Sequence, residues 1–464
     1  MTTTTTTFDV VCIFVRFDGM KLICRLIFSL ITIGFVLICL LNKFESSSSL
    51  NNQLKPRHCR IEVFGGFEGV EQSYISGVLF RDIRSICSCY LHYQSIDQFS
   101  ISSWQFSRIV WCILKCPIDV IEWCRNHRHR SYCQKNVILF DLFDENLDYP
   151  IEHYSYFASV YRNYLRFNSR NQLTYLTNDL KQLLEINQLK LFHRTLNWTL
   201  AIEIMKQEWA HLGFHFNNIS HRPNANIRNE IDRRIVQRIL IDNENISYHT
   251  WPNLDKQINS NVFWFPLGFT TNYLYKTVEF NSIPLSQRKR LWSWIGSTKL
   301  NERNDLLNRF QSNDSLTRQI KQQGFLFVTD REKRNLIEMN YTSILLDSQF
   351  VPLPRGYSPE QYRSFELIQS GAFPIVNRRW TQIKRNLRFE PLSYLNVLGY
   401  DPPTLNHFNE LPYKLFELSH LPNQLLDNWQ SIMLFRHRII INTLTKHIAN
   451  RVCQTNNQSR VARF

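Results

Sequence analysis

The chain has 464 residues, of which 44% are hydrophobic, and a formal net charge of +15 at pH 7. This length and apolar content exclude a small peptide held by disulfides and predict two or three domains with buried cores. The charge alone excludes no class of partner, because nucleic acid, anionic lipid and small phosphate-bearing ligands are all attracted to a basic surface.

The N-terminal region predicts a membrane anchor. Leu22 to Leu41 is an almost entirely apolar stretch of twenty residues, which is long enough to span a bilayer. No small-residue cleavage site follows it, which favours an anchor over a cleaved signal peptide, although Met20 is an alternative start. We therefore expect a cytoplasmic tail at 1–21, a transmembrane helix at 22–41 and a polar stem at 42–58.

Glycosylation sequons indicate the compartment. Six N-x-S/T sequons follow the predicted anchor, at Asn197, Asn218, Asn245, Asn313, Asn340 and Asn457. Together they favour a type II protein of the Golgi membrane whose larger part is lumenal. Nucleic acid is not expected as a partner there.

Cysteines are concentrated just after the predicted stem. Seven lie between Cys59 and Cys133, and Cys453 stands alone near the end. In an oxidising lumen they predict disulfides. The alternative is a zinc site built from Cys112, Cys116, Cys124 and Cys133 with His127 or His129. The spacing of these residues matches no standard zinc-ligand pattern. The basic run Arg125–Arg130 (RNHRHR) in this segment is interpreted as a solvated face.

Apolar runs predict an α/β fold in both halves of the chain. In the first half they are Val137–Phe143 and Val262–Leu267, with amphipathic segments at Tyr154–Leu165 and Ile202–Leu212. In the second half they are Leu291–Gly296, Gly324–Val328, Ser348–Leu353 and Ala372–Val376. Strands separated by helix-length stretches indicate parallel βαβ units. We expect an N-terminal lobe at 59–275, a C-terminal Rossmann-like lobe at 276–425, a cleft between them, and a C-terminal helix and tail at 426–464.

The segment Phe350–Val376 carries the most chemical information. Ser358 is typical of a helix N-cap and Gln361 of its capping box, and Gly371 is typical of a helix end, so the predicted helix spans about 359–370. The preceding turn, Pro354–Tyr357, would lie at the carboxyl end of a strand, where open α/β sheets bind phosphates.

Two residues on this helix suit a nucleotide. Arg363 and Glu366 are three residues apart on one helix face, so the guanidinium could neutralise a diphosphate while the carboxylate accepts hydrogen bonds from ribose hydroxyls. The alternative is an ion pair within the helix. Neither side chain is expected in the core.

This segment resembles the nucleotide-binding signature of the exostosin glycosyltransferase family. The similar residues are the turn Pro354-Arg355-Gly356, Arg363 with Glu366, and the strand motif Gly371–Val376; the cysteine usual before that turn's proline is Leu353 here. Upstream, Trp292–Phe310 is similar to the family's other donor-side element, with Arg303 as its second phosphate contact. Phe143–Arg166 and Pro266–Phe269 are similar to the subgroup around the ribitol xylosyltransferase.

The resemblance implies a GT-B-type fold and an inverting transfer from a UDP-sugar, with UDP-xylose as one candidate, to a glycan or glycoprotein acceptor. The donor contacts would be Arg303, Arg355, Gly356, Tyr357, Ser358, Arg363 and Glu366. Asp144 or Glu145, after a predicted strand, is the candidate general base, and Arg162 the candidate contact to an acidic acceptor. The sequence contains no Asp-x-Asp motif, so we expect no metal and no other cofactor.

Three alternatives stay open at this point. The chain could be a catalytically degenerate protein that binds a glycan or a partner, or a two-lobed transferase of another family. A nucleic-acid binder is compatible with the charge, whereas the predicted anchor and the sequons argue against it. Homo-oligomers, or hetero-oligomers with other transferases, are both compatible with the sequence.

Overall fold

The computed structural model of the protein describes seventeen stretches or single positions of the chain, all beyond its first 59 residues. They are 60–64, 79, 83, 86, 90–94, 108–113, 118–141, 154–163, 197–216, 223–241, 261–269, 273, 283–297, 301–329, 341–356, 361–381 and 392–461. Within them, no helix is both long and apolar enough to cross a bilayer. The predicted anchor at 22–41 lies outside this part of the chain, as do the tail and stem.

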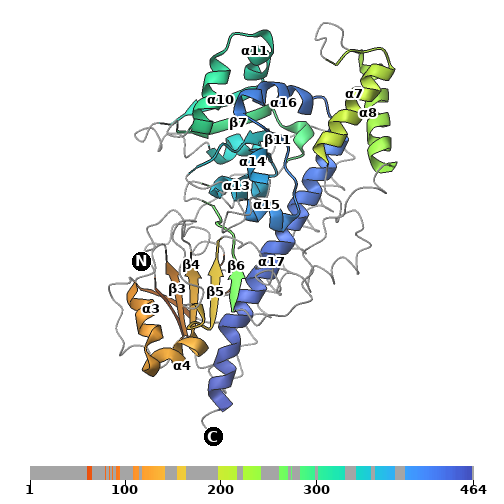
Figure 1. The fold of residues 1–464 in the computed structure, drawn as a ribbon. Helices are drawn as coiled ribbons and strands as arrows, with labels where there is room; N and C mark the ends of the chain where they lie inside the picture. The colour runs from red at the N-terminus through yellow and green to blue at the C-terminus, as the bar shows by residue number, and fades with distance from the viewer. Residues whose placement is uncertain are drawn as a thin grey trace, which may run out of the picture. The chain divides into compact units, whose positions relative to one another are not determined.

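The first half of the chain contributes a parallel sheet of six described strands, in the order β2-β1-β3-β4-β5-β6 (Figure 1). These strands are β1 (Arg60–Phe64), β2 (Tyr90–Gln94), β3 (Arg108–Ile113), β4 (Val137–Asp141), β5 (Ser159–Arg162) and β6 (Val262–Trp264). The helices described in this half of the chain are α3 (Ile118–Arg125), α4 (His127–Asn136), α7 (Trp198–His211) and α8 (Ala225–Ile241). Of these, α7 packs against the second sheet, since the ring of Trp198 contacts Phe350 and Phe373.

The second half contributes a parallel sheet of five described strands, in the order β11-β10-β9-β7-β8. These strands are β7 (Arg290–Gly296), β8 (Gly324–Val328), β9 (Ser348–Pro352), β10 (Phe373–Asn377) and β11 (Thr404–Leu405). The helical elements are η8 (Leu285–Gln287), α10 (Asn301–Gln311), α11 (Ser315–Gln322), α13 (Tyr362–Ser370), α14 (Arg378–Thr381), α15 (Ser393–Leu398), η10 (Phe408–Glu410), α16 (Leu411–Leu418) and α17 (Asn423–Val461).

Both sheets follow one topology. In each, the first strand pairs with the second on one side and with the third on the other, and the later strands are added beyond the third. All pairings between the described strands are parallel, which requires a crossover connection between successive strands. The predicted α/β fold with two parallel sheets is confirmed.

The four strands predicted in the second half are confirmed, and their pattern explains why. Strands β7, β9 and β10 are buried on both faces, so each appears in the sequence as a largely apolar run. Strand β8, at the edge of the described sheet, is half-buried, and its last residue, Val328, is exposed. In β7, for example, Trp292 and Trp294 are both almost fully buried. The amphipathic segment at 154–165 instead contains β5, whose four residues, the polar Ser159 and Arg162 among them, are all buried.

Two further predictions concern the cysteines and the C-terminal helix. Cys124 and Cys133 form a disulfide, so the alternative zinc site built on both is wrong, because the paired sulfurs are no longer thiolate ligands. The long helix α17 touches both halves of the fold: His447 Nδ1 lies 3.2 Å from the hydroxyl of Tyr161 in β5, and Gln430 donates to the carbonyl of Gly371, just before β10, at 3.1 Å.

Candidate functional site

The candidate site lies at the carboxyl edge of the second sheet. The chain passes from β7 to β8 on one side and then to β9 on the other, so the carboxyl ends of β7 and β9 are neighbours at the point where the strand order reverses. Open parallel sheets bind ligands in the crevice outside such a point. The residues that follow β7, β9 and β10 meet here.

Glu302, near the start of α10, links the three connections. Its Oε2 accepts from the backbone N–H of Arg355 at 2.6 Å, and its Oε1 accepts from Trp380 Nε1 at 3.2 Å and from the Arg379 guanidinium. Glu302 is 7% exposed, so a buried carboxylate holds the turn after β9 and the helix after β10 against α10. Sequence reasoning missed this residue.

Three arginines gather at these connections, and one of them, Arg379, bonds to the carboxylate through its guanidinium. Arg303 donates from Nε to the carbonyl of Arg355 at 3.2 Å and from Nη1 to Ser297 Oγ at 3.1 Å. Arg355 is exposed and lies over the Trp380 ring at 5.2 Å, and Arg379 lies over the same ring at 4.5 Å. Among the side chains that the structure describes here, positive charge therefore exceeds negative charge, an arrangement that suits a diphosphate.

The turn before α13 departs from the prediction. The helix begins at Tyr362, and its N-cap is Gln361 in extended conformation with no capping side chain, so the predicted capping box and the start near residue 359 are wrong. The Gln361 side chain donates instead to the carbonyl of Pro354 at 2.8 Å and fixes the turn. Gly356 is buried beside Arg303, whereas Tyr357 and Ser358 lie outside the described residues.

The predicted end of this helix is confirmed. Gly371 has φ 73°, in the left-handed region, and its N–H donates to the carbonyl of Ile368 at 3.0 Å. A Cβ there would also come within 2.6 Å of Gln430 Nε2. The glycine therefore serves both the helix end and the close approach of α17.

Arg363 and Glu366 meet a third residue that the sequence did not indicate. Tyr341 donates from its hydroxyl to Glu366 Oε2 at 2.7 Å and accepts from Arg363 Nε at 3.3 Å. Burial, with Glu366 beside it, raises the pKa of the Tyr341 hydroxyl, so it stays protonated and donates. A second guanidinium nitrogen of Arg363 donates to the carbonyl of Ile295 in β7.

The expectation that neither residue belongs to the core is wrong for Glu366. Glu366 is 2% exposed, whereas Arg363 is half-buried. Substitution of Glu366 would leave the buried hydroxyl of Tyr341 without the carboxylate that accepts its hydrogen bond. A loss of activity in such a variant would therefore not separate ligand binding from folding.

The carboxyl edge of the first sheet holds Arg162, the predicted acceptor contact. Arg162 ends β5 at 4% exposure, and its Nη1 donates to the hydroxyl of Tyr154 at 3.4 Å. Next to it, Asn163 is 2% exposed, and neither polar atom of its side chain has a hydrogen-bond partner in the described structure.

The predicted catalytic residues Asp144 and Glu145 follow β4 in the sequence but lie outside the described residues.

A small cavity lies away from both edges just described. It is lined by residues of α15, α17 and the segment between α15 and β11, among them Tyr400, Trp429 and Arg436. Tyr400 stacks on Phe373, the first residue of β10, which places the cavity at the amino edge of the second sheet. It is therefore not part of the candidate site.

No protein-family model and no curated protein matches the chain. The interpretation of the site therefore depends on its own geometry. That geometry adds Glu302, Tyr341, Arg379 and Trp380 to the predicted set. Only the pair Arg379-Trp380 had a sequence signal, since it directly follows the apolar run that forms β10.

Proposed function

We propose that the chain is an inverting glycosyltransferase that transfers a sugar from a UDP-sugar to a glycan acceptor in the Golgi. The proposal includes a GT-B-type arrangement, in which the second sheet binds the donor and the first sheet the acceptor. It also includes the type II membrane anchor and a reaction that requires no metal.

One observation carries the donor assignment: Arg303, Arg355 and Arg379 gather around the switch point of a parallel sheet. These residues come from three separate connections, and among the described side chains there the arginines outnumber the one carboxylate, Glu302. A pyrophosphate is the ligand class that matches several guanidiniums at the carboxyl ends of parallel strands. The uridine and the inverting outcome come from the resemblance to the exostosin family.

The proposed reaction is a single displacement. An acceptor hydroxyl attacks the anomeric carbon from the face opposite UDP; its oxygen forms the new glycosidic bond while the bond between that carbon and the phosphate oxygen breaks. The electron pair leaves with UDP, whose growing charge the guanidiniums stabilise. The hydroxyl proton passes to a carboxylate, for which Asp144 and Glu145 are the candidates.

Arg355→Ala is the sharpest test of the donor site. The backbone N–H and carbonyl of Arg355 make the bonds to Glu302 and Arg303, so removal of its exposed side chain leaves those bonds intact. We expect the dissociation constant for UDP, measured by titration calorimetry on the full chain, to rise roughly 10- to 100-fold, the effect of one charged hydrogen bond. The matched control is Arg318→Ala, an exposed arginine on α11.

A screen of nucleotide sugars separates the alternatives. Release of UDP from a UDP-sugar, reduced in Arg355→Ala and unchanged in Arg318→Ala, would support the proposal. Turnover of a guanosine-linked donor would assign the chain to another transferase family, and UDP binding without turnover would assign it to a degenerate binding protein. An unchanged UDP affinity in Arg355→Ala would refute the donor site itself.

A further inference from the structure

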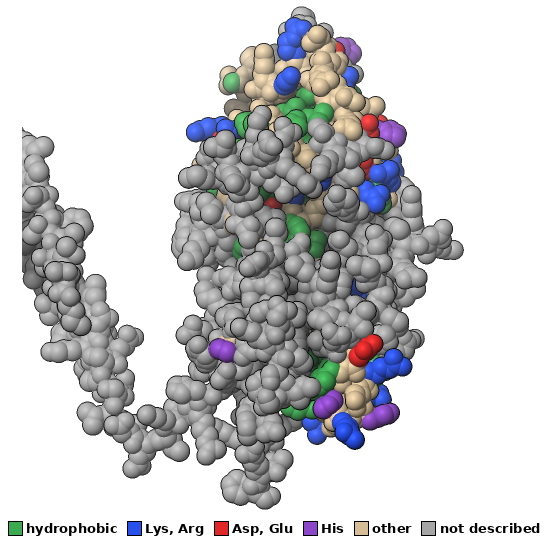
Figure 2. Space-filling model, turned by 90° about the vertical axis from the view of Figure 1, so that its left-hand side faces the viewer, with side chains coloured by type: hydrophobic (Ala, Val, Ile, Leu, Met, Phe, Trp, Pro, Cys, Tyr) green, Lys and Arg blue, Asp and Glu red, His purple; other side chains and the backbone are tan. Residues whose placement is uncertain are grey.

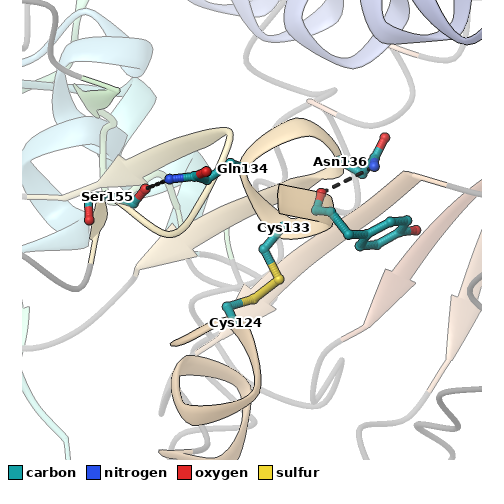
Figure 3. The surroundings of a disulfide bond; sticks show 6 residues. Cys124, Cys133, Gln134, Asn136 and Ser155 are labelled. Atoms are coloured by element: carbon teal, nitrogen blue, oxygen red, sulfur yellow. Dashed lines mark hydrogen bonds between the residues drawn. A yellow bond between two sulfur atoms is a disulfide. The ribbon is translucent and has the colours of Figure 1, made fainter. Parts of the chain in front are cut away.

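A second basic surface lies on the first half of the fold, on the two short helices α3 and α4. We call residues 118–136 the basic hairpin. The disulfide between Cys124 and Cys133 joins the two helices, and Figure 3 shows it between them. Gln134 donates to the carbonyl of Ser155 at 3.0 Å and ties the hairpin to the segment before β5.

The hairpin presents positive charge to solvent. Its cationic and histidine side chains gather at the lower right of the surface in Figure 2. The exposed members are Arg125, His127, Arg128 and Lys135, and the half-buried ones are His129 and Arg130. Among the described side chains of the hairpin, Glu122 is the one carboxylate. Neither Arg125 nor Arg128 forms an ion pair with any residue that the structure describes.

Packing holds this charge in a defined arrangement. The ring of Trp123 stacks on that of His129 at 4.5 Å, and the guanidinium of Arg130 lies over the ring of Tyr156 at 5.0 Å. With the disulfide, these contacts restrict the hairpin before any ligand arrives. A pre-organised surface loses less conformational entropy on binding than a flexible basic tail would.

Two observations narrow the class of anion. A disulfide forms and persists in an oxidising compartment, where nucleic acid is not the expected partner. A surface that binds a lipid bilayer usually adds exposed apolar side chains that insert into it. The exposed large hydrophobic residues of the described structure are Ile86, Ile283, Val328 and Tyr413, none of which lies on the hairpin.

We propose that the basic hairpin binds an acidic polysaccharide, a chain that carries sulfate or carboxylate groups along its length. Several cations on one face match the repeated charges of such a chain, and the binding free energy would come from Coulomb attraction and the release of counterions. The inference does not depend on the proposed transferase activity. Binding of the polysaccharide to the hairpin in the absence of a nucleotide sugar would support this inference, whether or not the donor site is correctly assigned.

The test compares two charge reversals with the same change in net charge. The first variant is Arg125→Glu with Arg128→Glu on the hairpin. The control is Arg318→Glu with Arg438→Glu, two exposed arginines on α11 and α17. Heparin is the probe, and its dissociation constant is measured with the full chain at a fixed salt concentration. We expect it to rise at least about tenfold in the hairpin variant and to change less than about twofold in the control.

Three results would overturn the proposal. One is unchanged heparin affinity in the hairpin variant. Another is an equal loss in both variants, which would mean attraction to net charge rather than to this surface. The third is tighter binding of the wild-type chain to phosphatidylserine vesicles than to heparin. If the hairpin variant lost this vesicle binding, the surface would be assigned to a membrane.

A milder variant, Arg125→Gln with Arg128→Gln, should give an intermediate loss of heparin affinity. Equal melting temperatures of all variants and the wild-type chain would show that the variants are folded.

Discussion

The two edges of the second sheet use arginine in opposite ways. At the amino edge, Arg288 is 5% exposed and donates to the carbonyls of Ser348 at 2.7 Å and Ser370 at 2.6 Å. At the carboxyl edge, Arg355 is exposed and its guanidinium lies over the ring of Trp380. Arg288 satisfies carbonyls at the start of β9 and the end of α13, whereas Arg355 lies at the position proposed for a ligand.

The net charge of +15 therefore does not measure how many arginines and lysines can bind an external anion. Burial lowers the pKa of Arg288 to about 10, which shows that its charge is held at a cost and is compensated by carbonyls of the fold. Such an arginine cannot serve an external anion. Only basic residues whose side chains reach solvent can, and the carboxyl edge and the basic hairpin each hold several of them.

The largest effect expected from the comparison is on stability, at the amino edge. Arg288→Ala removes the donor to several buried carbonyls, so we expect the free energy of unfolding in urea to fall by more than about 3 kcal/mol. Lys289→Ala, at the adjacent exposed position, is the control and should change it by less than about 0.5 kcal/mol. Equal stabilities of the two variants would mean that Arg288 does not hold this edge together.

The next largest effect is a pH dependence near the same edge. His437 on α17 accepts from the hydroxyl of Tyr394 and donates to Gln369 near the end of α13. Burial, with a smaller contribution from Arg438, lowers its pKa to about 3. The unfolded chain, with a histidine pKa near 6.5, therefore binds a proton that the folded chain does not, between about pH 6.5 and pH 3.

Stability should accordingly be lost as the pH falls through this window, by about 1.4 kcal/mol per pH unit for this one proton. The measurement is the free energy of unfolding from pH 7 to pH 4.5 in the wild-type chain and in His437→Gln. The variant is expected to show a smaller slope, by about one proton. His447, whose pKa burial lowers to about 4, stays in both proteins and contributes equally. Identical slopes would contradict the assignment of a buried neutral His437.

The smallest effect expected tests whether the carboxyl edge is also structural. Glu302→Gln keeps the shape of the side chain but removes its charge, which weakens the bonds from Arg355, Arg379 and Trp380. We expect the free energy of unfolding to fall by about 1–2 kcal/mol. The control is Glu203→Gln at an exposed position of α7. If Glu302→Gln costs as much as Arg288→Ala, the two edges do not differ in the way described.

The strands of the second sheet could be predicted because each one is a local pattern. The run Gly324–Val328 matches β8 at both ends, and Leu291–Gly296 matches β7 to within one residue. The same logic failed at 154–165, because β5 buries the polar Ser159 and Arg162 and so lacks the pattern of an apolar strand. The helix start at Tyr362 was missed because the Gln361 side chain bonds to the turn rather than to the helix.

The candidate site was predicted only in its local parts. Arg303, Arg355 and Arg363 stood out by their positions beside expected strands and helix starts. Nothing near Glu302 in the sequence indicates that its carboxylate accepts from the backbone of a residue 53 positions later. Tyr341 was noted only as part of the sequon at Asn340, which says nothing of the contact by which its hydroxyl joins Arg363 to Glu366.

By itself, the sequence determined the α/β class, the parallel runs of the second half, the glycine that ends α13 and the basic character of the chain. Those features depend on neighbours along the chain, which periodicity and turn chemistry record. Only the tertiary structure decided which arginines are buried and which reach solvent, and which carboxylate holds them. The reason is that burial and ion pairing depend on groups brought together across a sheet, whose separation in the sequence leaves no local pattern.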